Sequence, residues 1–378
     1  MAERDERERG ERKRGGERRG RERRTGGGRE PERGGEERRA AGQAEEEAGG
    51  RGPRVSEHHK RVIAAALAAT SVGGTLAATA GGGPGTAEGA VTGREPTREG
   101  LPAPPSGGDI VRADWDLPVE RNDRVDFFIE FLMGKNRDKT KEWLQRLGKY
   151  APYLRQELRA RNMPEDLVFL AFIESGLNPN AYSRADAAGL WQFIAETGRR
   201  YGLEVSEYVD ERRDPIKATR AALDYLGDLH DRFGSWYLAA AAYNTGENRV
   251  ERILGEKAGG RKGDEALYWQ ISSAIPRETR DYVPLMLAAG HIGKDPAKYG
   301  FTDLRYEDPL SFDVVRVPAN TPLADVARAA GVDEETIYDL NPHLVKKRTP
   351  PDRDWNVRVP VGTAETVAAN FGGGSPSA

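Results

Sequence analysis

The stretch Leu167–Phe193, which reads LVFLAFIESGLNPNAYSRADAAGLWQF, decides the fold of this chain. Leu167, Leu170 and Ala171 recur at helical spacing, which predicts a helix with one apolar face packed on a core. Glu174 is next on that face, in the last turn. Burial and the negative end of the helix dipole both disfavour a charged carboxylate there, so Glu174 is a candidate general acid. The alternative is that Glu174 merely ends a helix at the surface.

Several short motifs occur in order from the end of this helix onward. They are Glu174-Ser175, Ala181-Tyr182-Ser183, Gly189-Leu190-Trp191-Gln192-Phe193 and Ala241-Ala242-Tyr243-Asn244-Thr245-Gly246. Together they resemble the lysozyme-like lytic transglycosylases, and most closely the membrane-bound lytic murein transglycosylase D group, over roughly Val119 to Gly290. The resemblance implies a mainly α fold, with a lysozyme-like catalytic domain of the soluble lytic transglycosylase type, which we place at residues 109–300.

The same resemblance implies a reaction and a set of site residues. Glu174 would act as acid and then as base, cleaving the MurNAc-β-1,4-GlcNAc bond of peptidoglycan without water and leaving 1,6-anhydro-MurNAc ends. The substrate-binding residues that it implies are Ser183, Gln192, Tyr243, Asn244 and Tyr282. Residue chemistry alone leaves a second role open for Gln192 and Tyr243, as buried side chains that hydrogen-bond only within the protein.

Asp186 stands where the family often has Gly, and it keeps another function open. Ordinary glycosidases use two carboxylates, so a second one near Glu174 would favour hydrolysis by a lysozyme-like muramidase. The other interpretation places Asp186 in solvent. A non-catalytic peptidoglycan-binding protein is a further alternative, which the joint presence of Glu174, Gln192 and Tyr243 disfavours.

Composition narrows the class of protein. The 378 residues have room for two or three domains, but 37% hydrophobic residues and a mean hydropathy of -0.72 are low for a fully globular chain. A net charge of -3 gives no reason to expect nucleic acid as a partner. The absence of Cys excludes disulfides, thiolate metal sites and a lipid-modified N-terminal Cys. The five His residues show no metal-ligand spacing, so we expect neither a metal nor a cofactor.

The composition of the N-terminal residues 1–108 predicts little ordered structure. Residues 1–54 are nearly all Arg, Glu and Gly, a composition that cannot build a core and indicates a disordered arm. Residues 55–80 carry basic residues, a short apolar run and Ala78-Thr79-Ala80, which is typical of a secretory signal peptide. The apolar run is too short for a good transmembrane helix. Residues 81–108 are rich in Gly and Pro and predict a flexible linker.

A signal peptide should begin a chain, so its position has two explanations. Synthesis begins near Val55 and the arm is never made, or residues 62–80 form an uncleaved membrane anchor. Either way we expect a periplasmic or cell-envelope protein whose partner is the glycan strand of peptidoglycan. The sequence does not determine an oligomeric state.

Other helices follow from apolar spacing. Asp214 suits an N-cap with Pro215 in the first turn, and Asn244 and Gly246 should stop a helix that is apolar all round. The expected helical segments are Val119–Arg161, Gly189–Tyr201, Ala218–Phe233, Trp236–Tyr243 and Leu285–His291.

Residues 311–362 have a different pattern. Asp313–Val317 and Asn356–Pro360 alternate like strands and flank two short helices, at Leu323–Ala330 and Glu334–Leu340. This βααβ order resembles a LysM peptidoglycan-binding module, which would be a small, separable α+β unit. Where such modules carry Gly-Asp-Thr, this chain has Ala319-Asn320-Thr321, so sugar binding stays open. We expect residues 363–378 to be a flexible tail.

Overall fold

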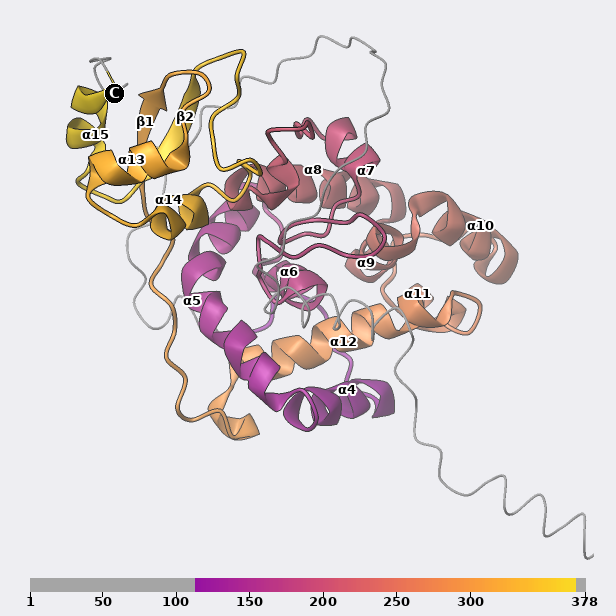
Figure 1. Ribbon diagram of the computed structural model, residues 1–378. Coiled ribbons are helices and arrows are strands. Elements are labelled where there is room, and N and C mark those ends of the chain that lie inside the picture. Colours follow the sequence, from indigo (N-terminus) through magenta and orange to yellow (C-terminus); the bar gives the residue numbers. More distant parts are fainter. Residues whose placement is uncertain (1–112, 372–378) are drawn as a thin grey trace, which may run out of the picture. The chain divides into compact units, whose positions relative to one another are not determined.

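The computed structural model describes residues 113–371, in which a helical domain is followed by a small α+β module (Figure 1). The expected arm, signal peptide or anchor, and linker lie outside the described residues, as do residues 372–378. The elements of the helical domain are α4 (Asp123–Met133), α5 (Arg137–Ala160), η2 (Glu165–Leu167), α6 (Val168–Ser175), α7 (Ala195–Arg200), η3 (Glu211–Arg213), α8 (Pro215–Phe233), α9 (Trp236–Thr245), α10 (Glu247–Ala258), α11 (Ala266–Ile271), α12 (Arg277–Lys294) and η4 (Ala297–Tyr299). The expected mainly α fold is confirmed.

Two short helices form the centre of the helical domain. In α9 every residue from Tyr237 to Ala242 is buried, as expected for a helix that is apolar all round, and α8, α10, α11 and α12 pack around it. The whole of α6 is buried as well, and it packs on α5 and α12 (Figure 1). The carboxylate on α6 is therefore carried into the core.

Local sequence signals set several helix ends. Asp214 accepts hydrogen bonds from the backbone N–H groups of Ile216 and Lys217 and so caps α8, as expected. Gly246, with φ of 90°, ends α9. The prediction of a helix from Gly189 was wrong, because the helix begins only at Ala195 and the preceding residues form a hairpin-like loop.

The α+β module matches the expected order closely. Strand β1 (Asp313–Val317) pairs antiparallel with β2 (Trp355–Val359), and α13 (Leu323–Ala330) and α14 (Glu334–Leu340) lie between them in the chain. The expectation of a flexible tail from residue 363 was wrong for residues 364–370. Residues Ala364–Asn370 form α15, and Val367 is fully buried in the core of the module, so the module extends to the end of the described residues.

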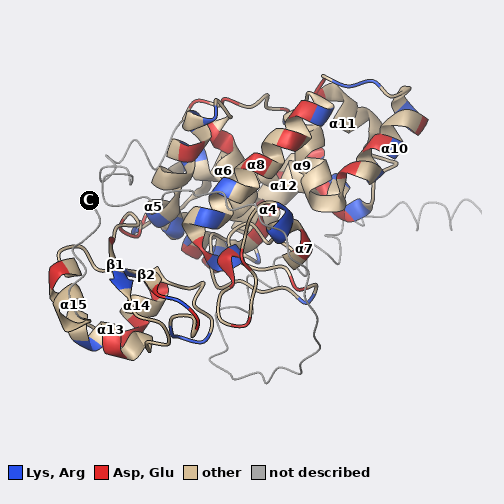
Figure 2. Ribbon diagram, turned by 90° about the horizontal axis from the view of Figure 1, so that it is seen from above, with Lys and Arg blue, Asp and Glu red and all other residues tan. Residues whose placement is uncertain are grey.

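Charge is spread over the described residues without a single-sign face. Figure 2 shows Lys and Arg interspersed with Asp and Glu along the helices. No helix within residues 113–371 is both long enough and apolar enough to cross a membrane.

Candidate active site

The end of α6 is fixed by a glycine that no other residue can replace without strain. Gly176 has a φ of 62°, and its N–H donates to the carbonyl oxygen of Phe172 at 2.9 Å. A Cβ at this position would lie 2.2 Å from Nε1 of Trp143. The helix must therefore stop directly after Ser175, which places Glu174 in its last turn.

The start of α6 is held from a distant part of the chain. The carboxylate of Asp116 accepts hydrogen bonds from the N–H groups of Glu165 at 2.7 Å and Asp166 at 3.0 Å. The carboxylate of Asp166 in turn lies 2.5 Å from Nζ of Lys294 on α12. Both ends of this short helix are thus tied down, so the position of Glu174 is well defined.

Glu174 lies in surroundings suited to a protonated acid. Only 7% of the residue is exposed, and the hydroxyl of Tyr282 donates to Oε1 of Glu174 at 2.6 Å. Burial raises the pKa of Glu174 to about 7, and the bond from Tyr282 opposes that rise in part. A large share of the molecules therefore carries a proton on Glu174 near neutral pH. The surface alternative for Glu174 does not hold.

The loop after α6 is anchored to the helix end and to α8. The hydroxyl of Ser175 donates to the carbonyl oxygen of Leu190 at 2.8 Å. Nε1 of Trp191 donates to Oγ1 of Thr219 on α8 at 2.9 Å. Backbone bridges join Ala188 to Tyr182 and to Phe193, which folds residues 182–193 back on themselves. We call residues 182–193 the site loop.

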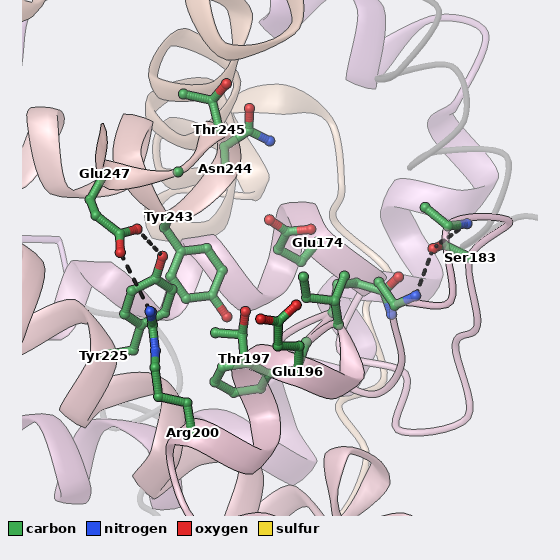
Figure 3. Close-up of a pocket in the computed structure, with 16 residues that line it drawn as sticks. Glu174, Ser183, Glu196, Thr197, Arg200, Tyr225, Tyr243, Asn244, Thr245 and Glu247 are labelled. Carbon is green, nitrogen blue, oxygen red and sulfur yellow. Dashed lines mark hydrogen bonds and ion pairs between the residues drawn. The ribbon is translucent and has the colours of Figure 1, made fainter. Parts of the chain in front are cut away.

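A cavity of about 460 Å³ lies beside Glu174 (Figure 3). Its walls come from the end of α6, the site loop, α7, α8 and the junction of α9 with α10. The structure brings together four residues that the sequence analysis singled out as substrate-binding. They are Ser183, Gln192, Tyr243 and Asn244.

Two of these residues belong to the site loop and are held by its backbone. Nε2 of Gln192 donates to the carbonyl oxygens of Gly189 at 2.8 Å and Ala181 at 3.3 Å, which leaves Oε1 as an acceptor. Gln192 has a φ of 50°, an uncommon conformation for this residue type. Oγ of Ser183 accepts from the N–H groups of Ala185 and Ala187, which leaves its own hydrogen to donate.

The other two lie where α9 emerges from the core. The hydroxyl of Tyr243 donates to the carbonyl oxygen of Trp191 at 2.8 Å, while its ring lines the cavity. Oδ1 of Asn244 accepts from Oγ1 of Thr279 at 2.9 Å, which leaves its amide hydrogens as donors. Gln192 and Tyr243 each hydrogen-bond within the protein and also line the cavity, so the two roles left open for them do not exclude one another.

Tyr282, the fifth residue that the resemblance implies, lies in the core beside the acid. It is 2% exposed and is not among the residues that line the cavity. It lies on the inner face of α12, where its hydroxyl reaches Glu174 from within the core. Tyr282 therefore contacts the acid directly, and its substrate-binding role stays a prediction.

The carboxylates near the cavity fit the interpretation that places Asp186 in solvent. Asp186 is exposed, accepts a 3.0 Å hydrogen bond from the hydroxyl of Tyr182, and does not line the cavity. Glu196 and Glu247 do line it, and Figure 3 shows Glu247 joined to Tyr225 and Arg200. The sequence analysis did not single out Glu196 or Glu247. Among residues 113–371, no three His, Cys, Asp or Glu side chains are grouped to hold a metal ion.

Comparison with known proteins agrees with this geometry. Residues 152–265 match the Transglycosylase SLT domain, and residues 311–371 match the LysM-like domain of lytic transglycosylase MltD. Membrane-bound lytic murein transglycosylase D of Escherichia coli (strain K12) is 36% identical over 193 residues, 51% of this chain and 42% of that protein. A putative tributyltin chloride resistance protein of Alteromonas sp. (strain M-1) is 41% identical over 115 residues, 30% of this chain and 56% of that protein.

A partial likeness to a solved structure is also found. The 70 kDa soluble lytic transglycosylase Slt70 of Escherichia coli aligns over 49% of this chain and 32% of its own length, with 20% identity and a TM-score of 0.34. The chain spans less than half the length of the Escherichia coli transglycosylase D that it matches. The similarity therefore extends to a transglycosylase SLT domain over residues 152–265 and to a LysM-like domain of the lytic transglycosylase MltD kind over residues 311–371.

Proposed function

We propose that this protein is a peptidoglycan lytic transglycosylase that cleaves the bond between MurNAc and GlcNAc without water. The observation that carries the proposal is the carboxyl group of Glu174, which is buried, has a pKa raised to about 7 and borders a cavity of about 460 Å³. The matches to the SLT and LysM-like domains support the same substrate class.

In the first step Glu174 gives its proton to the glycosidic oxygen. The bond from C1 of MurNAc to that oxygen breaks, its electron pair stays with the oxygen, and GlcNAc leaves with a free hydroxyl. Positive charge develops at C1, as in other glycoside cleavages. The carboxylate that Glu174 has become faces this charge, and the hydroxyl of Tyr282 stabilises the carboxylate.

In the second step the Glu174 carboxylate takes the proton of the C6 hydroxyl of the same MurNAc. The C6 oxygen then bonds to C1 and closes the 1,6-anhydro ring, and Glu174 is protonated again. Substrate and products differ by no water, so the reaction needs no second carboxylate to activate one. Asp186, which is exposed and is not among the residues that line the cavity, agrees with this requirement.

The remaining polar groups of the cavity suit the N-acetyl sugar. Oε1 of Gln192 is an acceptor for the acetamido N–H, while the hydroxyl of Ser183 and the amide of Asn244 are donors for its carbonyl oxygen. The Tyr243 ring forms a wall beside Glu174 (Figure 3). We assign these four side chains to holding the sugar in position for proton transfer.

We further propose that the enzyme works in the cell envelope, where peptidoglycan is found. Its Escherichia coli relative is a membrane-bound lytic murein transglycosylase by name. Attachment of this chain to a membrane would depend on residues 62–80, which lie outside the described residues.

Product analysis after digestion of purified sacculi tests the reaction. The wild-type protein should release muropeptides ending in 1,6-anhydro-MurNAc, one water lighter by mass spectrometry than the hydrolysis products. Glu174→Gln keeps the shape but can neither give nor take the proton, so the rate should fall by at least about 10²–10⁴-fold. Asp186→Asn is the matched control, because Asn tolerates the left-handed backbone at this position and the exposed carboxylate takes no part.

Two results would contradict the proposal. Dominant reducing MurNAc ends would identify a muramidase, and Glu196, as an exposed carboxylate on the cavity wall, would then replace Asp186 as the residue to test for activation of water. Binding of glycan strands with no turnover by the wild-type protein would identify a non-catalytic peptidoglycan-binding protein.

A further inference from the structure

A buried ion pair joins the LysM-like module to the helical domain. Nη2 of Arg358, on β2, lies 3.0 and 2.7 Å from the two carboxylate oxygens of Asp214, the N-cap of α8. Arg358 is 1% exposed and Asp214 is fully buried. Burial opposes ionisation of Asp214, but the charge of Arg358 outweighs it and holds the pKa of Asp214 well below its ordinary value. Burial lowers the pKa of the neighbouring His343 to about 3, so at neutral pH Arg358 is the cation of the pair and His343 is neutral.

Arg358 is fixed within its own module as well. Its backbone N–H donates to Oδ1 of Asn341 at 2.9 Å, and its carbonyl oxygen accepts from Nδ2 of the same residue at 2.7 Å. Its guanidinium lies 4.8 Å from the ring centroid of Phe312. Because Arg358 is held in this way, its guanidinium has little freedom to move relative to the module. A shift of the module would therefore shift the contact with Asp214.

Backbone pairing adds a second connection beside the ion pair. The N–H of Asp210 donates to the carbonyl oxygen of His343 at 2.8 Å, and the N–H of Val345 donates to the carbonyl oxygen of Tyr208 at 3.1 Å. Between them Val209 is fully buried within the core of the module. A residue of the helical domain thus completes the hydrophobic core of the LysM-like module.

The docked segment supports the site loop directly. Arg212, which is 4% exposed, forms two 2.8 Å hydrogen bonds to the carboxylate of Asp210. Its Nη1 donates to the carbonyl oxygens of Asp186 at 2.5 Å and Phe193 at 3.1 Å, near the middle and at the end of the site loop. A Cβ at Gly189 would lie 1.7 Å from the carbonyl oxygen of Arg212, so the two segments meet backbone to backbone.

We propose that the LysM-like module is a structural part of the catalytic site, in which Arg358 acts as a positioning residue for the site loop. The connection runs from Arg358 to Asp214 and the adjoining Asp210–Arg213 turn, and from Arg212 to the loop that carries Ser183 and Gln192. This inference rests on the proposed function for its kinetic consequences but not for its structural ones. It differs from the expectation of a small, separable module.

Full-length variants test the connection. Arg358→Met removes the guanidinium at similar length and leaves Asp214 buried without its cation. The matched control is Arg353→Met, which breaks an ion pair from the same module to Glu204 that is partly exposed and therefore weak. Two measurements are needed: kcat and KM on soluble glycan fragments, and hydrogen exchange of backbone amides.

Arg358→Met should raise KM and lower kcat/KM by about ten- to a hundredfold, because the loop that orients the sugar is loosened while Glu174 on α6 is not moved. The amides of Ser183, Ala188 and Gly189, which are hydrogen-bonded within the loop or to its base, should exchange faster. The amides of α9 should exchange as in the wild type. Arg353→Met should leave both measurements unchanged.

Faster exchange confined to residues 208–214 and 341–345, with unchanged kinetics, would show a merely local structural pair and overturn the proposal. If Arg358→Met accelerates exchange throughout α9, the milder Arg358→Lys, which keeps the charge but loses the planar guanidinium that lies over Phe312, decides by the same comparison. An inactive wild-type protein would refute the proposed function alone, because the exchange of the site loop still tests the connection.

Discussion

The hydroxyl of Tyr282 donates a 2.6 Å hydrogen bond to Oε1 of Glu174, and both residues are buried. One oxygen of the acid is thus fixed from the core side, which leaves Oε2 to carry the proton toward the cavity. The bond favours the ionised carboxylate, whereas burial favours the neutral acid. Tyr282 therefore keeps the pKa of Glu174 close to the pH at which one group can serve first as acid and then as base.

Removing this bond should shift the pH dependence of the reaction. In Tyr282→Phe the pKa of Glu174 should rise further, so the alkaline limb of kcat/KM should move to higher pH. Because the carboxylate formed in the first step loses a charge-assisted hydrogen bond, kcat should fall by roughly ten- to a hundredfold. Steady-state kinetics across pH would measure both effects.

Tyr268→Phe is the control for that variant. Its hydroxyl is equally buried and donates to the carbonyl oxygens of Thr279 and Arg280, with no bond to the acid. It should lower stability while leaving the alkaline limb in place. Identical pH profiles for Tyr282→Phe and the wild type would show that the tyrosine does not influence the acid.

The wild-type enzyme should lose activity as the pH rises through about 7, because the first step needs the protonated form of Glu174. The same pKa affects stability. Burial raises the pKa of Glu174 from 4.5 to about 7 on folding, so the folded state binds the proton more tightly. The stabilisation that results is complete below about pH 4.5 and is lost as the pH rises through about 7.

The Glu174→Gln side chain is neutral at every pH. The variant should therefore become more stable relative to the wild type as the pH rises. The free energy of unfolding of the variant minus that of the wild type should be larger at about pH 9 than at about pH 4. The increase should be on the order of 3 kcal/mol. Urea denaturation of both proteins at the two pH values would measure it. A difference that does not change with pH would mean that the acid is not protonated by burial.

Gly176→Ala should destabilise the protein by about 2–4 kcal/mol. Ala would have to adopt the left-handed backbone conformation of this position, and its methyl group would overlap the indole of Trp143. Gly255→Ala, inside α10 with open space around the new methyl, should instead be neutral or slightly stabilising. Thermal unfolding of the two variants would measure this difference in stability. Equal melting temperatures would contradict the role given to Gly176.

Tyr243→Phe should slow turnover by about tenfold, much less than Glu174→Gln, because it removes one hydrogen bond to the carbonyl oxygen of Trp191 and no proton-transfer group. Its ring would still form the cavity wall. Kinetics on soluble glycan fragments would measure the ratio between the two variants. A loss as large as that of Glu174→Gln would assign the hydroxyl a direct part in the chemistry.

Local sequence patterns predicted most of the helices and strands. The bounds of β1, α13 and α14 agree residue by residue with the alternation and spacing in the sequence. The end of α9 and the cap of α8 followed from single residues, Gly246 and Asp214. The wrong prediction of a helix from Gly189 has a tertiary cause, since the backbone there is packed against Arg212 and bridged across the loop.

By itself the sequence determined the helical class of the main domain and the βααβ order of the module, while its resemblance to the lytic transglycosylases implied the group of cavity residues around Glu174. These depend on periodicity, caps and motif order, which act over a few residues at a time. Only the tertiary structure decided that Tyr282 contacts the acid, that Asp186 stays in solvent and that Arg358 pairs with Asp214. The partners in these two contacts lie 108 and 144 residues apart in the chain, and the packing that joins or separates such groups leaves no local pattern.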